Sequence, residues 1–360
     1  MCGNCCREWQ VRLVKDEVEK LKKCYPAKNF YHEENNNYFL EHKNNRDCVF
    51  LDSDKLCSIH KESGYDYKPF PCRCFPFQFF YDGDNVNITC SFACPSIVHN
   101  TGNTITKDEI KSFIDEEKET ILKLPQKIKF TETILLDFSI YKKFVENLNK
   151  IFLLQISLNN KILYGSFLLN DIISGTFKLL DTTEYEKRKL TLKYSVNNKN
   201  ILLTSLIISN ESSLKKYSIL RRTFISFKFL LGLGDIYLHS AKNIPLKLRM
   251  INSQNVSINN ESTVERFFIN SIHSRFFLNH ETVWNAYVIW AVTYELIRTY
   301  ANALKESNTE DYISKSLIIV SRYYFHHTQY SQKLFLQKRI KNLFRHYTRN
   351  PDFFSFLLKG

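Results

Sequence analysis

Cysteine is the residue type in this sequence whose number and spacing are best suited to chemistry. All ten cysteines of the 360-residue chain lie at or before position 94, and the rest of the chain has none. Thiolates are ligands of zinc and of iron–sulfur clusters, and a Cys-x-x-Cys turn can bring two of them to one metal centre. Packing alone does not account for so many thiols in one short stretch. The sequence therefore predicts a cysteine-ligated metal domain within residues 1–100.

The candidate ligands fall into three groups along the chain. "CGNCC" opens the sequence, and "CVFLDSDKLCSIH" places two cysteines nine residues apart, around a turn that we expect at Asp52–Ser53–Asp54. "KPFPCRCFPF" and "CSFACP" form the third group. Cys24 and Cys74 have no partner at a recognised spacing, so we expect them to act as small packing residues. The candidate metal ligands are Cys2, Cys5, Cys6, Cys48, Cys57, Cys72, Cys90 and Cys94.

Two side chains beside these cysteines have alternative roles. Arg73 follows Cys72 and could donate hydrogen bonds to cluster sulfur, pair with Asp52, or be an ordinary surface guanidinium. His60 could ligate a metal. A solvated histidine in a turn is the favoured interpretation for His60.

The cellular compartment decides between metal ligation and disulfides. No basic segment followed by an apolar one opens the chain, and the longest apolar run, near Tyr287–Val292, is too short to span a bilayer. We therefore expect a cytoplasmic protein with no membrane span. Thiols persist in a reducing cytosol, where such a pattern indicates metal binding or redox chemistry.

Residues 1–100 resemble the YkgJ-type cysteine-cluster family of zinc- or iron-chelating proteins, which includes flagellin lysine N-methylases. The resemblance lies in "CGNCC", in "CVFLDSDKLCSIH", in "KPFPCRCFP" and in the closing Cys94-Pro95. The chain departs from the family where Lys68 replaces an arginine and Ser96 a glycine. It also begins inside the first motif, so one family cysteine would precede Met1. From the family spacing we expect one cluster of thiols to contain Cys5, Cys6, Cys48, Cys57, Cys72 and Cys94.

The family resemblance leaves the metal open between zinc and iron. Zinc sites close with four N or S ligands, and a [4Fe–4S] cluster also takes four thiolates. For the methylases, the resemblance implies a cluster-dependent transfer from S-adenosylmethionine, so we favour an iron–sulfur cluster. A glycine-rich cofactor turn is not present, because Gly232-Leu-Gly234 lies late in the sequence and is isolated. A C-x3-C-x2-C cysteine triplet is not present either. The sequence therefore identifies no catalytic residue and no S-adenosylmethionine site.

Apolar periodicity predicts an α+β fold, with a small loop-rich metal domain followed by a mostly helical domain with a few strands. We expect the metal domain over 1–100, a connecting helix and hinge over 101–130, and the mixed, then helical, domain over 131–360. Two helices are predicted before the second domain: one at 11–23, which ends at Cys24, and one at 106–124, which begins with a Thr106–Glu109 capping box. In the second domain we expect two strands within 187–208 and an extended segment at 236–251. Three helices follow, at 262–278, at 282–307 and at 314–346, and we expect the second of them to be buried in a bundle.

Charge is as unevenly distributed as cysteine. Residues 1–100 hold 13 Lys and Arg against 14 Asp and Glu, so residues 101–360 carry more than the whole net charge of +13. This basic second part, which includes the basic last helical region, could meet nucleic acid, an anionic membrane or an acidic protein, or the charge could serve only solubility. No nucleic-acid-reading motif accompanies it, so we expect a protein partner rather than nucleic acid.

Three functions fit these observations. The first is an enzyme, a methyltransferase for protein lysine that resembles the flagellin methylases and receives its protein substrate on the helical domain. The second is a non-catalytic module in which zinc staples the first domain and the basic helices bind a protein. The third is a redox sensor or electron carrier. The cysteines support metal binding far better than they support any one of these reactions.

Overall fold

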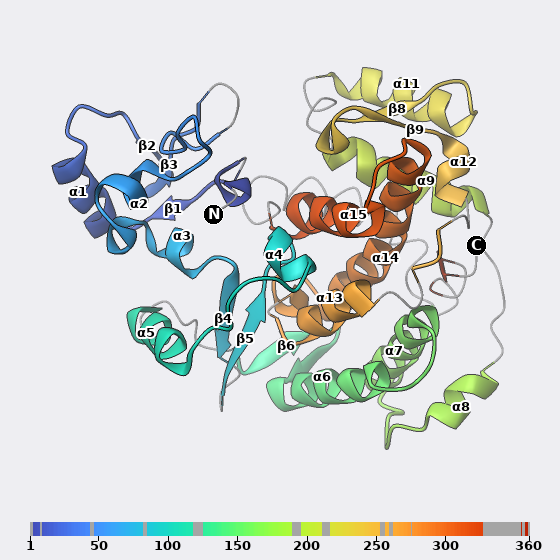
Figure 1. Ribbon diagram of the computed structural model, residues 1–360. Coiled ribbons are helices and arrows are strands. Elements are labelled where there is room, and N and C mark those ends of the chain that lie inside the picture. Colours follow the sequence, from blue (N-terminus) through green and yellow to red (C-terminus); the bar gives the residue numbers. More distant parts are fainter. Residues whose placement is uncertain are drawn as a thin grey trace. The chain divides into compact units, whose positions relative to one another are not determined.

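The chain divides into two compact units (Figure 1). Unit 1 comprises Met1–Gln78 and Cys90–Lys118, and unit 2 comprises Phe79–Thr89 and Glu119–Gly360. The described part of the chain contains no helix long and apolar enough to cross a membrane. The computed structural model describes residues 3–7, 9–43, 47–81, 85–117, 125–188, 196–210, 217–252, 256–258, 262–274 and 276–326, with Phe354, Leu357 and Leu358.

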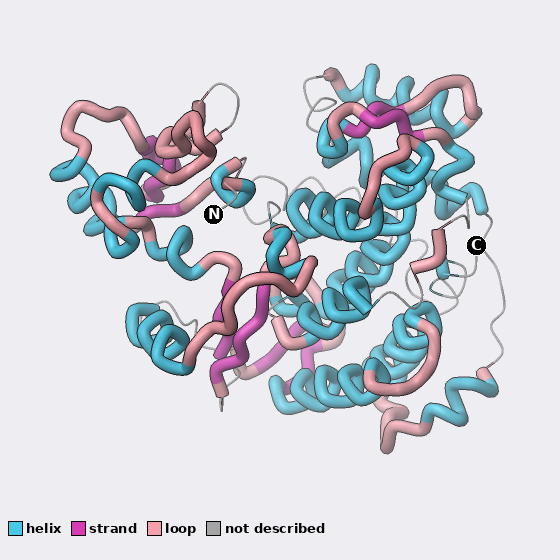
Figure 2. Tube along the Cα trace, in the orientation of Figure 1, coloured by secondary structure: helices cyan, strands magenta, loops and turns pink. Residues whose placement is uncertain are grey.

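Unit 1 is built from short elements around a small antiparallel sheet. The sheet has the order β1-β3-β2, and Figure 2 shows how much of the unit is loop. Asn35 and Asn36 make its β2–β3 turn with φ angles of 51° and 60°, a left-handed backbone that asparagine tolerates. The elements are η1 (Asn4–Cys6), β1 (Arg12–Leu13), α1 (Lys15–Cys24), β2 (Tyr31–Glu34), β3 (Asn37–Leu40), α2 (Ser58–Glu62), η2 (Tyr65–Tyr67), α3 (Phe70–Cys74), α4 (Pro95–Val98) and α5 (Lys107–Glu117).

The first helix begins later than its periodicity predicts. Arg12 pairs with Phe39 in the sheet, and the Glu17 carboxylate accepts the Val14 N–H at 2.9 Å, so α1 starts at Lys15. Its predicted end at Cys24 is confirmed. The capping box of α5 is also confirmed, because Thr106 N–H donates to Glu109 at 2.8 Å and Thr106 Oγ1 accepts the Glu109 N–H at 3.2 Å.

The hairpin of β4 (Phe77–Tyr81) and β5 (Val86–Cys90) carries the chain across the boundary between the units. Unit 2 is mainly helical, and the α+β fold class is confirmed. Its further elements are β6 (Lys127–Lys129), β7 (Leu135–Asp137), α6 (Phe138–Phe152), α7 (Leu158–Ile173), α8 (Thr182–Lys187), α9 (Val196–Asn210), α11 (Ile219–Leu230), β8 (Ile236–Leu238), η3 (His239–Ala241), β9 (Ile244–Leu246), α12 (Leu248–Asn252), α13 (Ser262–Ile272), η4 (Phe276–Leu278), α14 (Val283–Glu306), α15 (Tyr312–Val320) and η5 (Ser321–His326).

Helix α14 forms the core of unit 2, as its apolar content on all sides predicts. Of its 24 residues, only Asn285, Ile289, Lys305 and Glu306 are not buried. Trp290 lies between aromatic rings of α6, α13 and η4, and its indole N–H donates to Ser271 Oγ at 2.5 Å. The core of the helical unit is therefore an aromatic cluster around one buried helix.

Two sequence predictions in unit 2 are wrong and one is only partly tested. The expected strands within 187–208 are replaced from Val196 by helix α9, which contacts α14. The segment 236–251 is extended only in β8 and β9, which pair with each other, and α12 begins at Leu248. The predicted helix 314–346 is present as α15 and the π-helical η5, and its basic part after His326 lies outside the described residues.

Candidate metal centre

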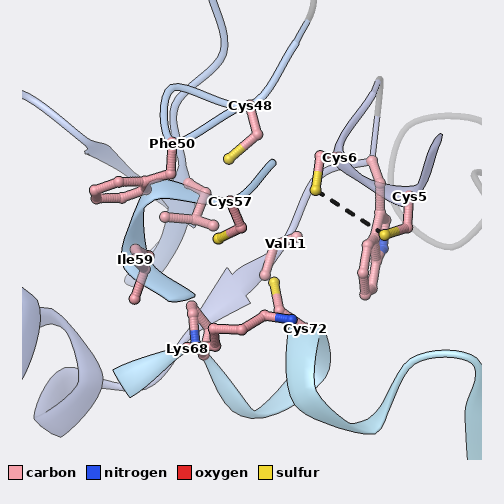
Figure 3. Close-up of a pocket in the computed structure, with 12 residues that line it drawn as sticks. Cys5, Cys6, Val11, Cys48, Phe50, Cys57, Ile59, Lys68 and Cys72 are labelled. Atoms are coloured by element: carbon pink, nitrogen blue, oxygen red, sulfur yellow. Dashed lines mark hydrogen bonds between the residues drawn. The ribbon is translucent and has the colours of Figure 1, made fainter. Parts of the chain in front are cut away.

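Five cysteine thiols from four segments of unit 1 line one pocket (Figure 3). The cavity volume is about 40 Å³. A single water-sized occupant needs about 10–15 Å³ of such space, so the pocket has room for more than one atom. Its lining residues are Cys5, Cys6, Trp9, Val11, Leu40, Cys48, Phe50, Cys57, Ile59, Lys68, Pro69 and Cys72.

The first two thiols come from the single turn η1. Gly3 precedes it with a φ of 63°, and a Cβ at Gly3 would lie 2.7 Å from the Lys55 carbonyl oxygen, so the turn requires glycine. The Sγ atoms of Cys5 and Cys6 are 4.0 Å apart. Two sulfurs bound tetrahedrally to one metal at about 2.3 Å lie about 3.8 Å apart. This pair is therefore close to the spacing of ligands on a shared metal.

The third thiol, on Cys48, is tied directly to the first turn. The Cys48 N–H donates to the Cys6 carbonyl at 2.7 Å. Arg7 and Asp47, the neighbours of these cysteines, form an antiparallel bridge, and Arg7 Nε lies 3.3 Å from Asp47 Oδ1. The backbone thus fixes two ligand segments against each other, far apart though they are in sequence.

Cys57 reaches the pocket through the predicted turn after Leu51, which is confirmed. Leu51 and Cys57 form an isolated antiparallel β-bridge, and Asp52 N–H donates to the Leu56 carbonyl at 2.9 Å. The Asp52 carboxylate accepts the Leu56 N–H at 2.8 Å, which closes the turn from its other side. Cys57 then forms the N-cap of α2, so its side chain leaves the chain at a fixed point.

Cys72 is placed by the short helix α3, whose start is set by proline and by a carboxylate. Pro69 is the N-cap, and its carbonyl accepts the Cys72 N–H at 2.9 Å. The Glu17 carboxylate of α1 accepts the Phe70 N–H at 2.6 Å. One glutamate therefore caps α1 and also anchors the helix that carries Cys72.

Arg73 and His60 take structural places. Arg73 pairs with Glu116 of α5 and not with Asp52, and its Nε donates to the Lys68 carbonyl at 3.0 Å. His60 lies on α2, outside the pocket lining, with its ring 5.7 Å from that of Tyr65. Arg73 thus stabilises the loop around Cys72, because it connects α3 to α5.

Burial favours the protonated thiol at Cys48 and Cys72. It raises the pKa of Cys48 from 9.0 to about 11 and also raises the pKa of Cys72. The hydrogen bond with Cys5, followed by burial, raises the pKa of Cys6. Lys68, whose side chain enters the pocket, opposes the shift at Cys72 (Figure 3). A metal must therefore displace protons from these thiols, and Lys68 stabilises the thiolates that result.

The other cysteines lie apart from this pocket or outside the described residues. Cys90 ends β5 and Cys94 caps α4, and neither lines the pocket, although we expected Cys94 to do so. The Ser91 N–H donates to the Pro76 carbonyl at 2.8 Å, and this bond sets the position of the chain that carries Cys90 and Cys94 after the hairpin. Cys24 is exposed, Cys74 is buried, and Cys2 is outside the described residues.

The thiols converge on one pocket, but their sulfur atoms are not all as close together as the ligands of a bound metal. Among the described residues, no three His, Cys, Asp or Glu side chains are already grouped as a metal ion would hold them. None of the nine described cysteines is in a disulfide. The centre is therefore a preformed pocket of thiols whose side chains must move to close around a metal.

Lys68 departs from the family pattern, which assigns no role to a lysine at this position. The structure places it in the pocket with Trp9 and Val11. Its position four residues before Cys72 in "KPFPC" was the available signal, because a cation beside thiolates lowers their pKa.

Comparison with known proteins agrees with this geometry. Residues 1–120 match the family model CxxCxxCC, described as "Putative zinc- or iron-chelating domain". The chain is also 26% identical over 124 residues to a protein of Salmonella muenchen named "Flagellar biosynthetic protein FliU", a match that covers 31% of this chain and 73% of that protein. No solved structure matches the chain. The first third of the chain is thus similar to zinc- or iron-chelating domains, and the thiol pocket lies within it.

Proposed function

We propose that unit 1 binds a [4Fe–4S] cluster through thiolates of the five-cysteine pocket. The observation that carries the proposal is the convergence of Cys5, Cys6, Cys48, Cys57 and Cys72 on one cavity. A [4Fe–4S] cluster takes four thiolates, which the pocket can supply. When bound, the cluster would supply redox chemistry.

The number and chemistry of the pocket ligands support iron–sulfur over zinc. A closed zinc site needs only four ligands around one ion, and zinc sites often use histidine. Among the described residues, the pocket lining has a fifth thiol and no histidine. Its apolar walls, such as Val11, Phe50 and Ile59, would keep water from a cluster, and the Lys68 cation would offset its negative charge.

The spectrum of anaerobically purified protein tests this assignment. We expect a brown protein with iron and sulfide in equal amounts and a broad visible absorption that bleaches with dithionite. The control is the same protein after treatment with a chelator and an oxidant, which should lose the absorption. A colourless protein that holds stoichiometric zinc would replace this proposal with the zinc-stapled module.

We further propose that the protein transfers a methyl group from S-adenosylmethionine to lysine of a flagellin-like protein. Support comes from the family resemblance of the thiol motifs and from the flagellar name of the Salmonella relative. The ε-amine of the substrate lysine would attack the methyl carbon of the sulfonium, with release of S-adenosylhomocysteine and a proton. Unit 1 would hold the cluster, and unit 2 would offer a surface for the substrate.

Incubation with methyl-labelled S-adenosylmethionine and purified flagellin tests the transfer. We expect label in flagellin lysines with the cluster-loaded protein and none when this protein is omitted. A flagellin whose lysines have been acetylated is the matched control substrate and should stay unlabelled. Unlabelled flagellin with fully loaded protein would contradict methyl transfer and leave the cluster assignment intact, which would favour the redox alternative.

A further inference from the structure

Helix α11 of unit 2 exposes a continuous apolar stripe. Leu220, Phe224 and Phe227 have relative exposures of 84%, 57% and 59%, and Leu231, directly after the helix, has 55%. Their spacing of four, three and four residues places all four on one side of the helix. Phe229, by contrast, is 1% exposed and faces the interior of the unit. The helix therefore buries one side and presents large apolar side chains on another.

Two further exposed apolar side chains follow the helix in the sequence. Leu233 is 70% exposed in the turn after α11, and Tyr237 of β8 is 58% exposed. Single exposed apolar side chains are normal on protein surfaces, but a group bordered by polar residues indicates an interaction site. Six such side chains within 18 consecutive residues of one segment make this surface, Leu220–Tyr237, a candidate for contact with another body.

The polar border of the stripe is cationic. Helix α11 contains Arg221, Arg222 and Lys228 and no acidic residue. Lys228 Nζ lies 4.9 Å from the centre of the Phe224 ring, and the Arg221 guanidinium lies 4.1 Å from that of Tyr217. Positive charge is thus held against aromatic rings along one edge of the stripe. The whole segment 217–252 contains six Lys and Arg residues and a single acidic residue, Asp235.

Charge decides which body fits this surface. A second copy would bring an identical cationic helix, and residues 327–350 of the same chain carry six Lys and Arg with no acid. Both would be repelled. The binding partner must therefore have an anionic surface that covers an apolar interior. A peptide-binding groove is formed between elements, whereas this stripe is one side of a single helix, which is the geometry of helices that lie in a membrane interface.

We propose that α11 is an interfacial helix through which the protein binds the surface of an anionic lipid bilayer. The apolar side chains of the stripe enter the boundary between headgroups and acyl chains, to a depth of about 5–10 Å. Arg221 and Lys228 contact the lipid phosphates. This binding is reversible and peripheral, and it does not depend on the metal centre of unit 1.

Flotation with lipid vesicles tests the proposal on the full-length, metal-loaded protein. We expect binding to vesicles of phosphatidylcholine mixed with phosphatidylglycerol, and little binding to phosphatidylcholine alone. The variant Leu220→Gln/Phe224→Gln/Phe227→Gln should lose the binding. Arg221→Gln/Lys228→Gln should weaken it about 25-fold at low salt, since each cation near an anionic surface contributes about five-fold, and should flatten its salt dependence.

A matched control uses exposed leucines elsewhere in the same unit. Leu153 and Leu179 are 67% and 82% exposed, and the double change to Gln should leave vesicle binding unchanged. Circular dichroism and metal content should be the same for all variants. Equal binding of wild type and stripe variant, or equal binding to neutral and anionic vesicles, would overturn the proposal. So would a wild-type dimer that the stripe variant dissociates, or stripe-dependent binding to a protein without binding to vesicles.

Discussion

Replacement of Cys72 by serine should abolish metal binding and unfold much of unit 1. Cys72 lies at the pocket in α3, which α1 and α5 hold through Glu17 and Arg73. Binding of a metal by thiolates of a folded site contributes directly to folding, with about 10–16 kcal/mol measured for structural zinc. The pocket holds five thiols and a cluster takes four, but Cys72 is the pocket thiol that α3 carries, so its loss detaches this helix from the metal and removes most of that contribution. Metal analysis of the purified protein and its protection from proteolysis within residues 1–118 would measure the two effects.

Cys24→Ser is the matched control for this change. Cys24 is exposed at the end of α1 and outside the pocket lining, so its variant should keep its metal and its protease resistance. Cys48→Ser should behave like Cys72→Ser, and Cys74→Ser should keep the metal. Equal loss of metal in the Cys24 and Cys72 variants would refute the assignment of ligands to the pocket.

Replacement of Glu295 by alanine should lower the free energy of unfolding of unit 2 by about 3–5 kcal/mol. Glu295 is fully buried on α14, and its Oε2 lies 2.8 Å from Lys199 Nζ of α9 and 2.6 Å from Arg298 Nη2. Its removal leaves two buried cations without their shared carboxylate. Burial already lowers the pKa of Lys199, which reflects the cost of its charge in this core. Urea unfolding followed by the circular dichroism of the helices would measure the loss.

Two variants separate this ion pair from general effects of substitution. Glu310 is exposed in the same unit, so Glu310→Gln should change stability little. Lys199→Met combined with Glu295→Gln removes both charges of one pair and should recover part of the loss, since buried ion pairs are non-additive. A Glu295→Ala protein as stable as wild type would mean that the carboxylate does not stabilise this core.

Local spacing predicted most of the thiol pocket, and tertiary placement accounts for what it missed. Spacing identified the five cysteines and predicted the turn at Asp52, which depends on nearby residues only, but the five meet through contacts between distant segments, such as that from the Cys48 N–H to the Cys6 carbonyl. Cys94 does not line the pocket with them. The β4–β5 hairpin lies between α3 and Cys94 in the sequence, and local sequence does not predict the position of the chain after a hairpin. For the same reason Arg73 pairs with Glu116, a residue of α5 that no sequence motif connects to it.

The error at α9 has a different physical origin. Asn197–Asn198 resembles a hairpin turn, and the Leu and Ile residues around it are common in strands. Tertiary packing decides instead, since Leu203 and Ile207 lie one helical turn apart and are both fully buried. Lys199 of the same helix also reaches Glu295 of α14. Contacts with a distant helix thus override a local preference, which a single sequence cannot indicate.

The division of unit 1 into two stretches of chain has a consequence for how the protein is made. All five pocket cysteines are synthesised by residue 72, but unit 1 is completed only by residues 90–118, after the hairpin. Glu116, which holds Arg73 beside Cys72, leaves the ribosome among the last of these. During this interval the growing chain presents its thiols before α3 is fixed in place. A metal that reaches the thiols during this interval therefore meets α3 before Glu116 of α5 holds Arg73.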